Sequence, residues 1–132
     1  MGFDMAAFFA FAQFSVDKEL MLFVFKLIHD EQIMKARSII SDPNNLERHV
    51  QGTISASRMP YNPSWSFHLI PESIGFFTNQ IEVCDANVTY IEKHLEEVGG
   101  GFLPKSKWCP WHSQLIGEVT HLVDPNTEEL RL

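Results

Sequence analysis

The chain has 132 residues, a length at which one domain buries roughly two thirds of the surface that the unfolded chain exposes, so a core requires neither a metal nor a disulfide. Seventeen acidic and ten basic side chains give a formal net charge of −7. An acidic surface repels phosphate backbones and anionic lipid, which argues against nucleic acid and membrane insertion and favours one small, acidic, soluble domain over residues 1–132.

The apolar run at residues 5–12 has the hydrophobicity of a signal-peptide core but not its flanks. The first basic residue is Lys18, and Asp4 adds a negative charge where a signal peptide carries positive ones. No apolar run reaches the length of about 18 residues that a membrane-spanning helix needs. We therefore expect the chain to carry neither a targeting signal nor a membrane span.

The first half of the chain predicts a hairpin, a helix and a further strand. Residues 6–14 and 20–28 are apolar runs of strand length, and the short polar segment between them suits a hairpin turn. Asp30 is then a candidate N-cap for a helix through residue 41, since a carboxylate accepts the free amide protons of a first turn. Residues 49–56 alternate loosely and are rich in β-branched side chains, which predicts a third strand.

The second half predicts two more strands and a second helix. Residues 65–69 alternate between apolar and polar, which places His68 on the polar face, and residues 76–83 are predicted to form another strand. Residues 86–98 carry an apolar stripe at helical spacing, and three glycines end this helix. The C-terminal segment fits either a helix or a strand. The order β-β-α-β-β-β-α predicts an α+β fold, with two helices packed on one face of a mainly antiparallel sheet.

Cys84 and Cys109 are the only cysteines, and the residues alone leave two alternatives open for them. A disulfide closing a loop of this length contributes roughly 3–4 kcal/mol in the chain-entropy model, but it requires an oxidising compartment. The alternative is a pair of separate buried thiols, which is a common state of cysteine in folded domains. Composition and spacing do not favour either alternative.

A metal site or a thiol-dependent active site is the sharper interpretation of the same region. Cys109 and His112 have Cys-x-x-His spacing, and Cys84 and His68 are the weak candidates for a third and a fourth ligand. Closed zinc sites usually contain two tight ligand pairs, and only one is present here. The sequence therefore predicts no metal, no cofactor and no catalytic residue, and it keeps a small metal- or thiol-dependent enzyme as an alternative.

Aromatic side chains on proline-rich stretches are the strongest candidates for recognition. Rigid aromatic groups bind a partner with little loss of conformational entropy, as at protein interfaces and sugar sites. The alternative is that Trp65 and at least one of Trp108 and Trp111 belong to the core, as tryptophan usually does. The predicted binding residues are Tyr61, Trp65, His68, Trp108 and Trp111.

Four stretches together carry a family resemblance: PYNPSWSFHL at residues 60–69, IEVCDA at 81–86, GGFLP at 100–104 and WCPW at 108–111. They resemble an uncharacterised family of small, often secreted domains, and the similarity extends upstream to residues 23–27 and 36–37. The family has no established activity, so the resemblance transfers no catalytic role. It implies that Cys84 and Cys109 pair as a disulfide, and it implies an extracellular location.

Three functions compete on this basis. The leading hypothesis is a non-catalytic binding module that engages a protein or a carbohydrate through its aromatic loops, with an inhibitor-type protein as one form. The metal- or thiol-dependent enzyme is the first alternative. The second is a structural or assembly subunit in which the Phe-rich first hairpin supplies a sheet edge.

Overall fold

The computed structural model describes residues 6–14 and 17–131 and begins with the predicted hairpin. Its two strands pair antiparallel over their whole length, with Ala10 opposite Val24. A third strand, not expected at its position, pairs with the other side of β1 and completes a sheet of order β2-β1-β9. Ser15 and Val16, in the predicted hairpin turn, lie outside the described residues. The strands are β1 (Ala7–Phe14), β2 (Leu20–Leu27) and β9 (Gln114–Glu118).

The second sheet is built around β3, which pairs antiparallel with three short strands. The predicted strand at 65–69 keeps only its last two residues, and the one at 76–83 ends at residue 77. His68 is 8% exposed, so the predicted polar face of that stretch is wrong. The strands are β3 (His49–Ser55), β4 (His68–Leu69), β5 (Gly75–Phe77) and β8 (Lys107–Trp108), and a separate parallel pair is formed by β6 (Val98–Gly99) and β7 (Phe102–Pro104).

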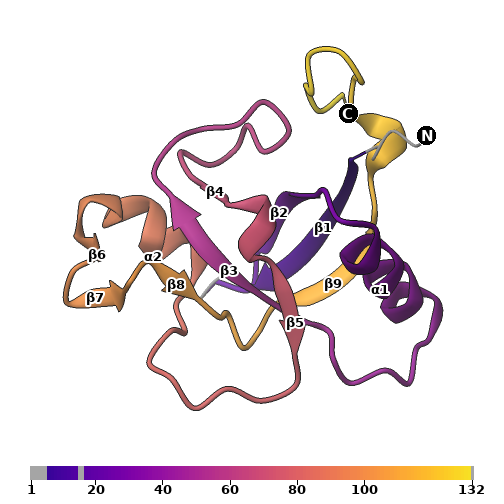
Figure 1. Ribbon diagram of the computed structural model, residues 1–132. Coiled ribbons are helices and arrows are strands. Elements are labelled where there is room, and N and C mark those ends of the chain that lie inside the picture. The colour runs from indigo at the N-terminus through magenta and orange to yellow at the C-terminus, as the bar shows by residue number, and fades with distance from the viewer. Residues whose placement is uncertain (1–5, 15–16, 132) are drawn as a thin grey trace.

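Two α-helices flank the sheets, α1 (Asp30–Ser41) next to β9 and α2 (Val88–Lys93) on the other side in Figure 1. Asp30 is the first residue of α1 rather than its N-cap, which is His29. In α2 the N-cap is Asn87, whose side chain accepts a hydrogen bond from the amide of Thr89. Within the described residues, neither helix is long and apolar enough to cross a membrane. The α+β class, with two helices and mainly antiparallel pairing, is confirmed.

Three single 3₁₀ turns complete the secondary structure and shorten two of the predicted elements. The predicted helix at 86–98 becomes α2 followed by a 3₁₀ turn, because the chain leaves the α conformation at His94. The C-terminal segment forms neither a long helix nor a strand after β9, but a 3₁₀ turn. The turns are η1 (Pro71–Ser73), η2 (Leu95–Glu97) and η3 (Thr120–Leu122).

Phenylalanine side chains fill the space between the two sheets. Trp108 is fully buried among them, with its ring edge-on to Phe11, Phe23 and Phe67 at centroid distances of 5.6, 5.3 and 5.7 Å. Its indole N–H donates to the carbonyl of Ala86 at 2.9 Å, so its polar atom is also satisfied. Trp108 is therefore the centre of the core, and the high phenylalanine content serves this core.

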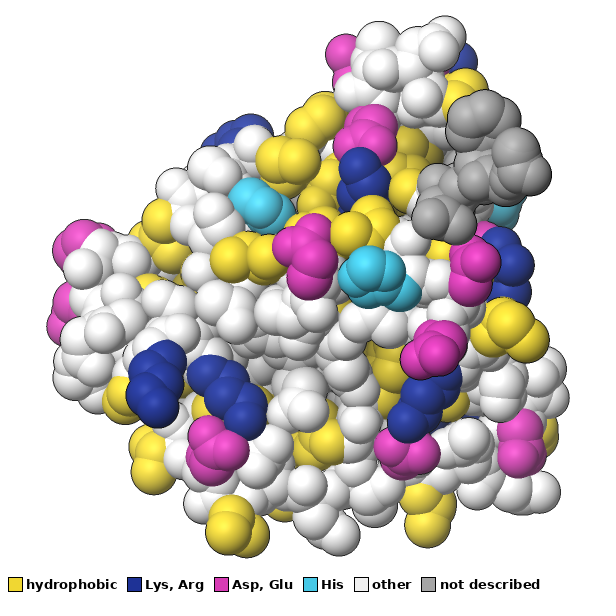
Figure 2. Space-filling view, viewed as in Figure 1, with side chains coloured by type: hydrophobic (Ala, Val, Ile, Leu, Met, Phe, Trp, Pro, Cys, Tyr) yellow, Lys and Arg dark blue, Asp and Glu magenta, His cyan; other side chains and the backbone are white. Residues whose placement is uncertain are grey.

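A smaller apolar cluster covers the opposite face of the β2-β1-β9 sheet. Phe8 and Val24 lie under Tyr61, from the loop after β3, and under Val123, from the C-terminal segment. Figure 2 shows hydrophobic side chains gathered between that loop and the C-terminal turn, with acidic and basic side chains interspersed on the rest of this face. The sheet is thus covered on both faces, by the main core on one and by two loops on the other.

Candidate functional site

Cys84 and Cys109 lie within disulfide-bonding distance, as the family resemblance implied. Their Cα atoms are 5.1 Å apart, and the amide of Cys109 donates to the carbonyl of Cys84 at 2.6 Å. Both side chains are almost fully buried. The bond joins the loop after β5 to the end of β8, so it fastens a long connection to the central sheet.

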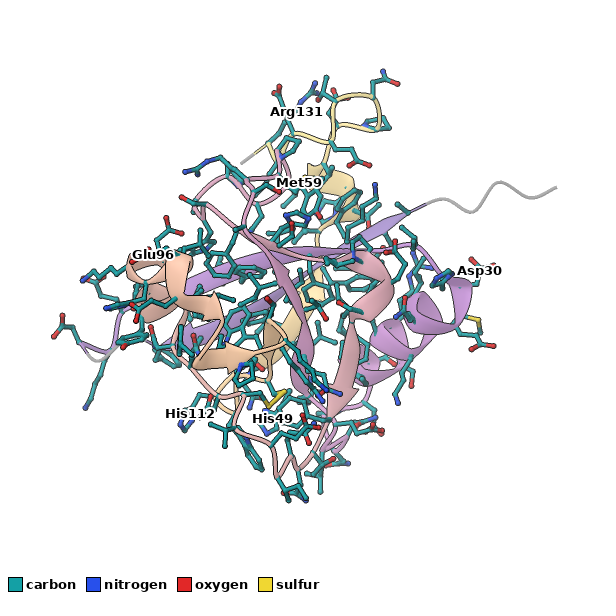
Figure 3. All side chains as sticks on the ribbon, turned by 60° about the vertical axis from the view of Figure 1, so that its left-hand side comes forward. Asp30, His49, Met59, Glu96, His112 and Arg131 are labelled. Carbon is teal, nitrogen blue, oxygen red and sulfur yellow. A yellow bond between two sulfur atoms is a disulfide. The ribbon has the colours of Figure 1, made fainter. Side chains whose placement is uncertain are left out.

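Three rings surround this disulfide and exclude solvent from it. Trp111 lies edge-on to Phe77 at 5.7 Å, and His49 contacts both rings. The His49 Nδ1 is 2.8 Å from the carbonyl oxygen of Ser113, which orients the imidazole. Figure 3 places His49 and His112 beside the disulfide, at the end of the molecule opposite Met59 and Arg131. The end that carries the disulfide is thus rigid and mainly apolar.

The loop between β5 and the disulfide presents two aliphatic side chains to solvent. Ile81 is 99% exposed and Val83 is 88% exposed. Glu82, between them, forms an ion pair with Lys107 at 2.8 Å, and Gln80 donates a hydrogen bond to Gln51 at 2.9 Å. A loop with two fully exposed β-branched side chains is therefore anchored on the sheet before and after them. We call Ile81, Glu82, Val83 and Trp111 the disulfide-end surface.

The predicted contact residues are mostly buried. Tyr61 and Trp108 are 0% exposed, Trp65 is 8% exposed, and only Trp111 reaches solvent to an intermediate extent. His68 is buried with its Nδ1 2.8 Å from the carbonyl oxygen of Ser57. The structure brings Trp111 to the disulfide, but it does not bring the other four together with it at the surface.

Sequence reasoning missed Ile81 and Val83. Their alternation around Glu82 is the pattern of a half-buried strand, which is why the run at 76–83 predicts one. The only local signal against that prediction is the cysteine that follows, because a disulfide can hold an apolar segment away from the core.

The metal and thiol alternatives lose the ligands on which they depended. Cys84 and Cys109 are bonded to each other, so neither offers a thiolate. His68 is buried in a hydrogen bond to the backbone, whereas His112 is exposed. Over residues 6–14 and 17–131, no group of three or more His, Cys, Asp and Glu side chains is placed to hold a metal ion.

Tyr61 is a buried tyrosine whose hydroxyl has no hydrogen-bond partner among the described residues. Burial raises the pKa of this hydroxyl to about 12, and the nearby carboxylate of Glu128 acts in the same direction. Tyr61 therefore holds the loop after β3 by apolar packing against Phe8, at a centroid distance of 5.2 Å, and not by hydrogen bonding.

Tyr61 is expected to make the fold sensitive to alkali. An unfolded tyrosine ionises at its usual pKa of 10, whereas Tyr61 keeps its proton to about pH 12, so the unfolded state gains stability as the pH rises between these values. Tyr61→Phe should remove roughly 1–2 kcal/mol of this loss by the upper end of that window. Urea unfolding at several pH values measures it, with Tyr90→Phe, at an exposed tyrosine, as the matched control. Equal slopes for wild type and Tyr61→Phe would contradict the assignment.

The fold and this site define a small α+β domain in which a long loop is fastened by a disulfide. Residues 5–122 match the family described as the BP-74 N-terminal domain, and because the match covers most of the sequence, the chain belongs to this family. No curated protein and no solved structure matches the chain. The resemblance noted in the sequence is thus confirmed at the level of a family, while its four stretches remain a predicted signature.

Proposed function

We propose that the protein is a non-catalytic binding module that engages another protein through the disulfide-end surface. The observation that carries the proposal is the pair of exposed side chains, Ile81 and Val83, on a loop held at both ends. Large exposed aliphatic groups lose little on partner binding except unfavourable contact with water, so they favour association. The anchors of the loop reduce the entropy lost when it is bound.

A protein partner fits this surface better than a carbohydrate. Sugar sites stack an exposed aromatic ring on the face of the sugar, and such a ring would have to come from Trp111 alone. Trp111 is only partly exposed because it packs on Phe77 and on the disulfide. Branched aliphatic side chains on an exposed loop instead complement an apolar pocket on the partner, which is how an inhibitor-type protein would also bind.

The test is a double substitution, Ile81→Asp with Val83→Asp, which places charges where apolar contact is proposed. Both positions are almost fully exposed, so the fold is expected to be unaffected. Leu46→Asp is the matched control, because Leu46 is 75% exposed and lies between α1 and β3. The immobilised proteins are incubated with extracts and secretions of the source cells, and retained proteins are identified by mass spectrometry and then titrated.

A partner retained by wild type and by Leu46→Asp, but bound at least about tenfold more weakly by the double variant, is the expected result, because burying an unpaired carboxylate costs more than about 1.4 kcal/mol. If every retained protein binds the double variant and the wild type equally, the disulfide-end surface is not the contact site and the proposal fails.

A further inference from the structure

A second apolar feature lies on the outer face of the β2-β1-β9 sheet, away from the main core. It is a groove of about 460 Å³ between β2, the loop at residues 62–65 and the C-terminal segment. Ala10 and Val24 form part of its floor, Trp65 stands on one side and Leu130 on the other. We propose that this groove binds an uncharged, apolar small molecule.

The hollow exists because short side chains follow one another across the sheet. Val24, Ala10 and Gly117 are direct neighbours in the strand register, so the middle of this row carries only a methyl group and a hydrogen atom. Phe8, two residues before Ala10 on the same strand face, is covered by Tyr61 instead. A side chain at Gly117 would meet no atom within 4 Å, so the space over this end of the row is open.

The polar groups that border the groove are already bonded within the protein. Trp65 donates its indole N–H to the carbonyl of Leu22 at 2.9 Å. Asn62 accepts from the amide of Val24 at 2.9 Å and donates to the carbonyl of Phe67 at 3.3 Å. The same bonds hold the loop at 62–65 on the open edge of β2, which keeps the walls in place. A ligand therefore finds few free donors or acceptors there.

The absence of charge in the lining decides the chemistry of the ligand. Among the described residues that line the groove, none is acidic, basic or histidine. A charged ligand would lose its hydration without gaining a counter-ion, whereas an uncharged apolar ligand would lose little. A volume of about 460 Å³ lies within the range of sites for small molecules. The exposed side chains of Leu20 and Leu22, at 55% and 47%, extend the apolar surface at the mouth.

The experiment compares two fluorophores that differ by one charged group, N-phenylnaphthylamine and its sulfonated analogue anilinonaphthalenesulfonate. Titrations are made in about 0.5 M sodium chloride, where the Debye length of about 4 Å suppresses the general repulsion of anions by an acidic protein. We expect the uncharged probe to saturate at one molecule per chain and the sulfonated probe to bind at least about tenfold more weakly. Equal affinities, or no saturable binding of the uncharged probe, would overturn the proposal.

Two substitutions of matched exposure locate the binding. Leu22→Asp introduces a carboxylate at the mouth of the groove, and Ile116→Asp introduces one on β9 at a residue that does not line it; the two side chains are 47% and 50% exposed. The first should weaken binding of the uncharged probe at least about tenfold and the second should leave it unchanged, since only the first carboxylate would be desolvated by the ligand. Unchanged binding by Leu22→Asp, in a variant with wild-type near-ultraviolet circular dichroism, would show that the probe binds elsewhere.

Discussion

Replacing both cysteines, Cys84→Ala with Cys109→Ala, is expected to lower the free energy of unfolding by about 3.5 kcal/mol. The bond closes a loop between residues that are 25 positions apart, and opening it lets the unfolded chain sample many more conformations. For a domain of this size such a loss is a large part of the total stability. Equilibrium unfolding in urea measures it as a lower midpoint, with a steeper slope because the unfolded state becomes less compact.

Reduced wild type is the control for this experiment, since it lacks the bond but keeps both sulfur atoms. Its midpoint should agree with that of the double variant, which would separate the effect of the bond from that of losing two buried sulfur atoms. If a strong reductant leaves the wild-type midpoint unchanged while free thiols are detected, the bond does not stabilise the fold. The loop that carries Ile81 and Val83 would then need another explanation for its position.

The hairpin and α1 could be predicted from sequence because their causes are local. The apolar runs that form β1 and β2 are adjacent in the chain, and the helical spacing of Ile33 and Ala36 identifies the buried side of α1. Asn87 was likewise recognisable as a helix cap from its residue type and its place before an apolar stripe. Each of these features depends on residues no more than a few turns apart.

The strands around β3 were overpredicted because pairing partners are chosen at long range. The stretch at 65–69 alternates as a strand does, but Trp65 bonds to the backbone of β2 and only the last two residues pair with β3. The run at 76–83 alternates equally well, yet the chain turns towards Cys109 after residue 77. Alternation identifies a half-buried segment, but it does not identify the sheet that the segment joins.

The candidate site was predicted only in part for a related reason. The cysteine pair and the presence of an aromatic residue beside it follow from the sequence, and Trp111 does pack against the disulfide. Exposure does not follow, because Trp108 and Trp111 have similar neighbours in sequence, with Cys109 and Pro110 between them. The strand β8 turns Trp108 into the core and leaves Trp111 on the loop beyond it. A change of one strand register would exchange these roles.

Trp108→Ala is expected to lower the free energy of unfolding by about 3–5 kcal/mol, because it leaves a cavity in the middle of the core. The indole contacts rings from both strands of the hairpin and from the segment before β4, so no single neighbour can move to fill the space. Trp108→Phe keeps most of the volume but removes the donor to the carbonyl of Ala86, and it should cost about 1–3 kcal/mol. Urea or thermal unfolding measures both losses.

Trp111→Ala is the matched control for this ranking, because Trp111 is the neighbouring tryptophan and is only partly buried. Its substitution removes the contact with Phe77 but opens no closed cavity, so the expected loss is about 1–2 kcal/mol. The order Trp108→Ala, Trp108→Phe, Trp111→Ala, from the largest loss to the smallest, follows from cavity formation being the dominant cost in a packed interior. A larger loss for Trp111→Ala than for Trp108→Ala would mean that the disulfide end, and not the space between the two sheets, is the part of the protein on which folding depends most.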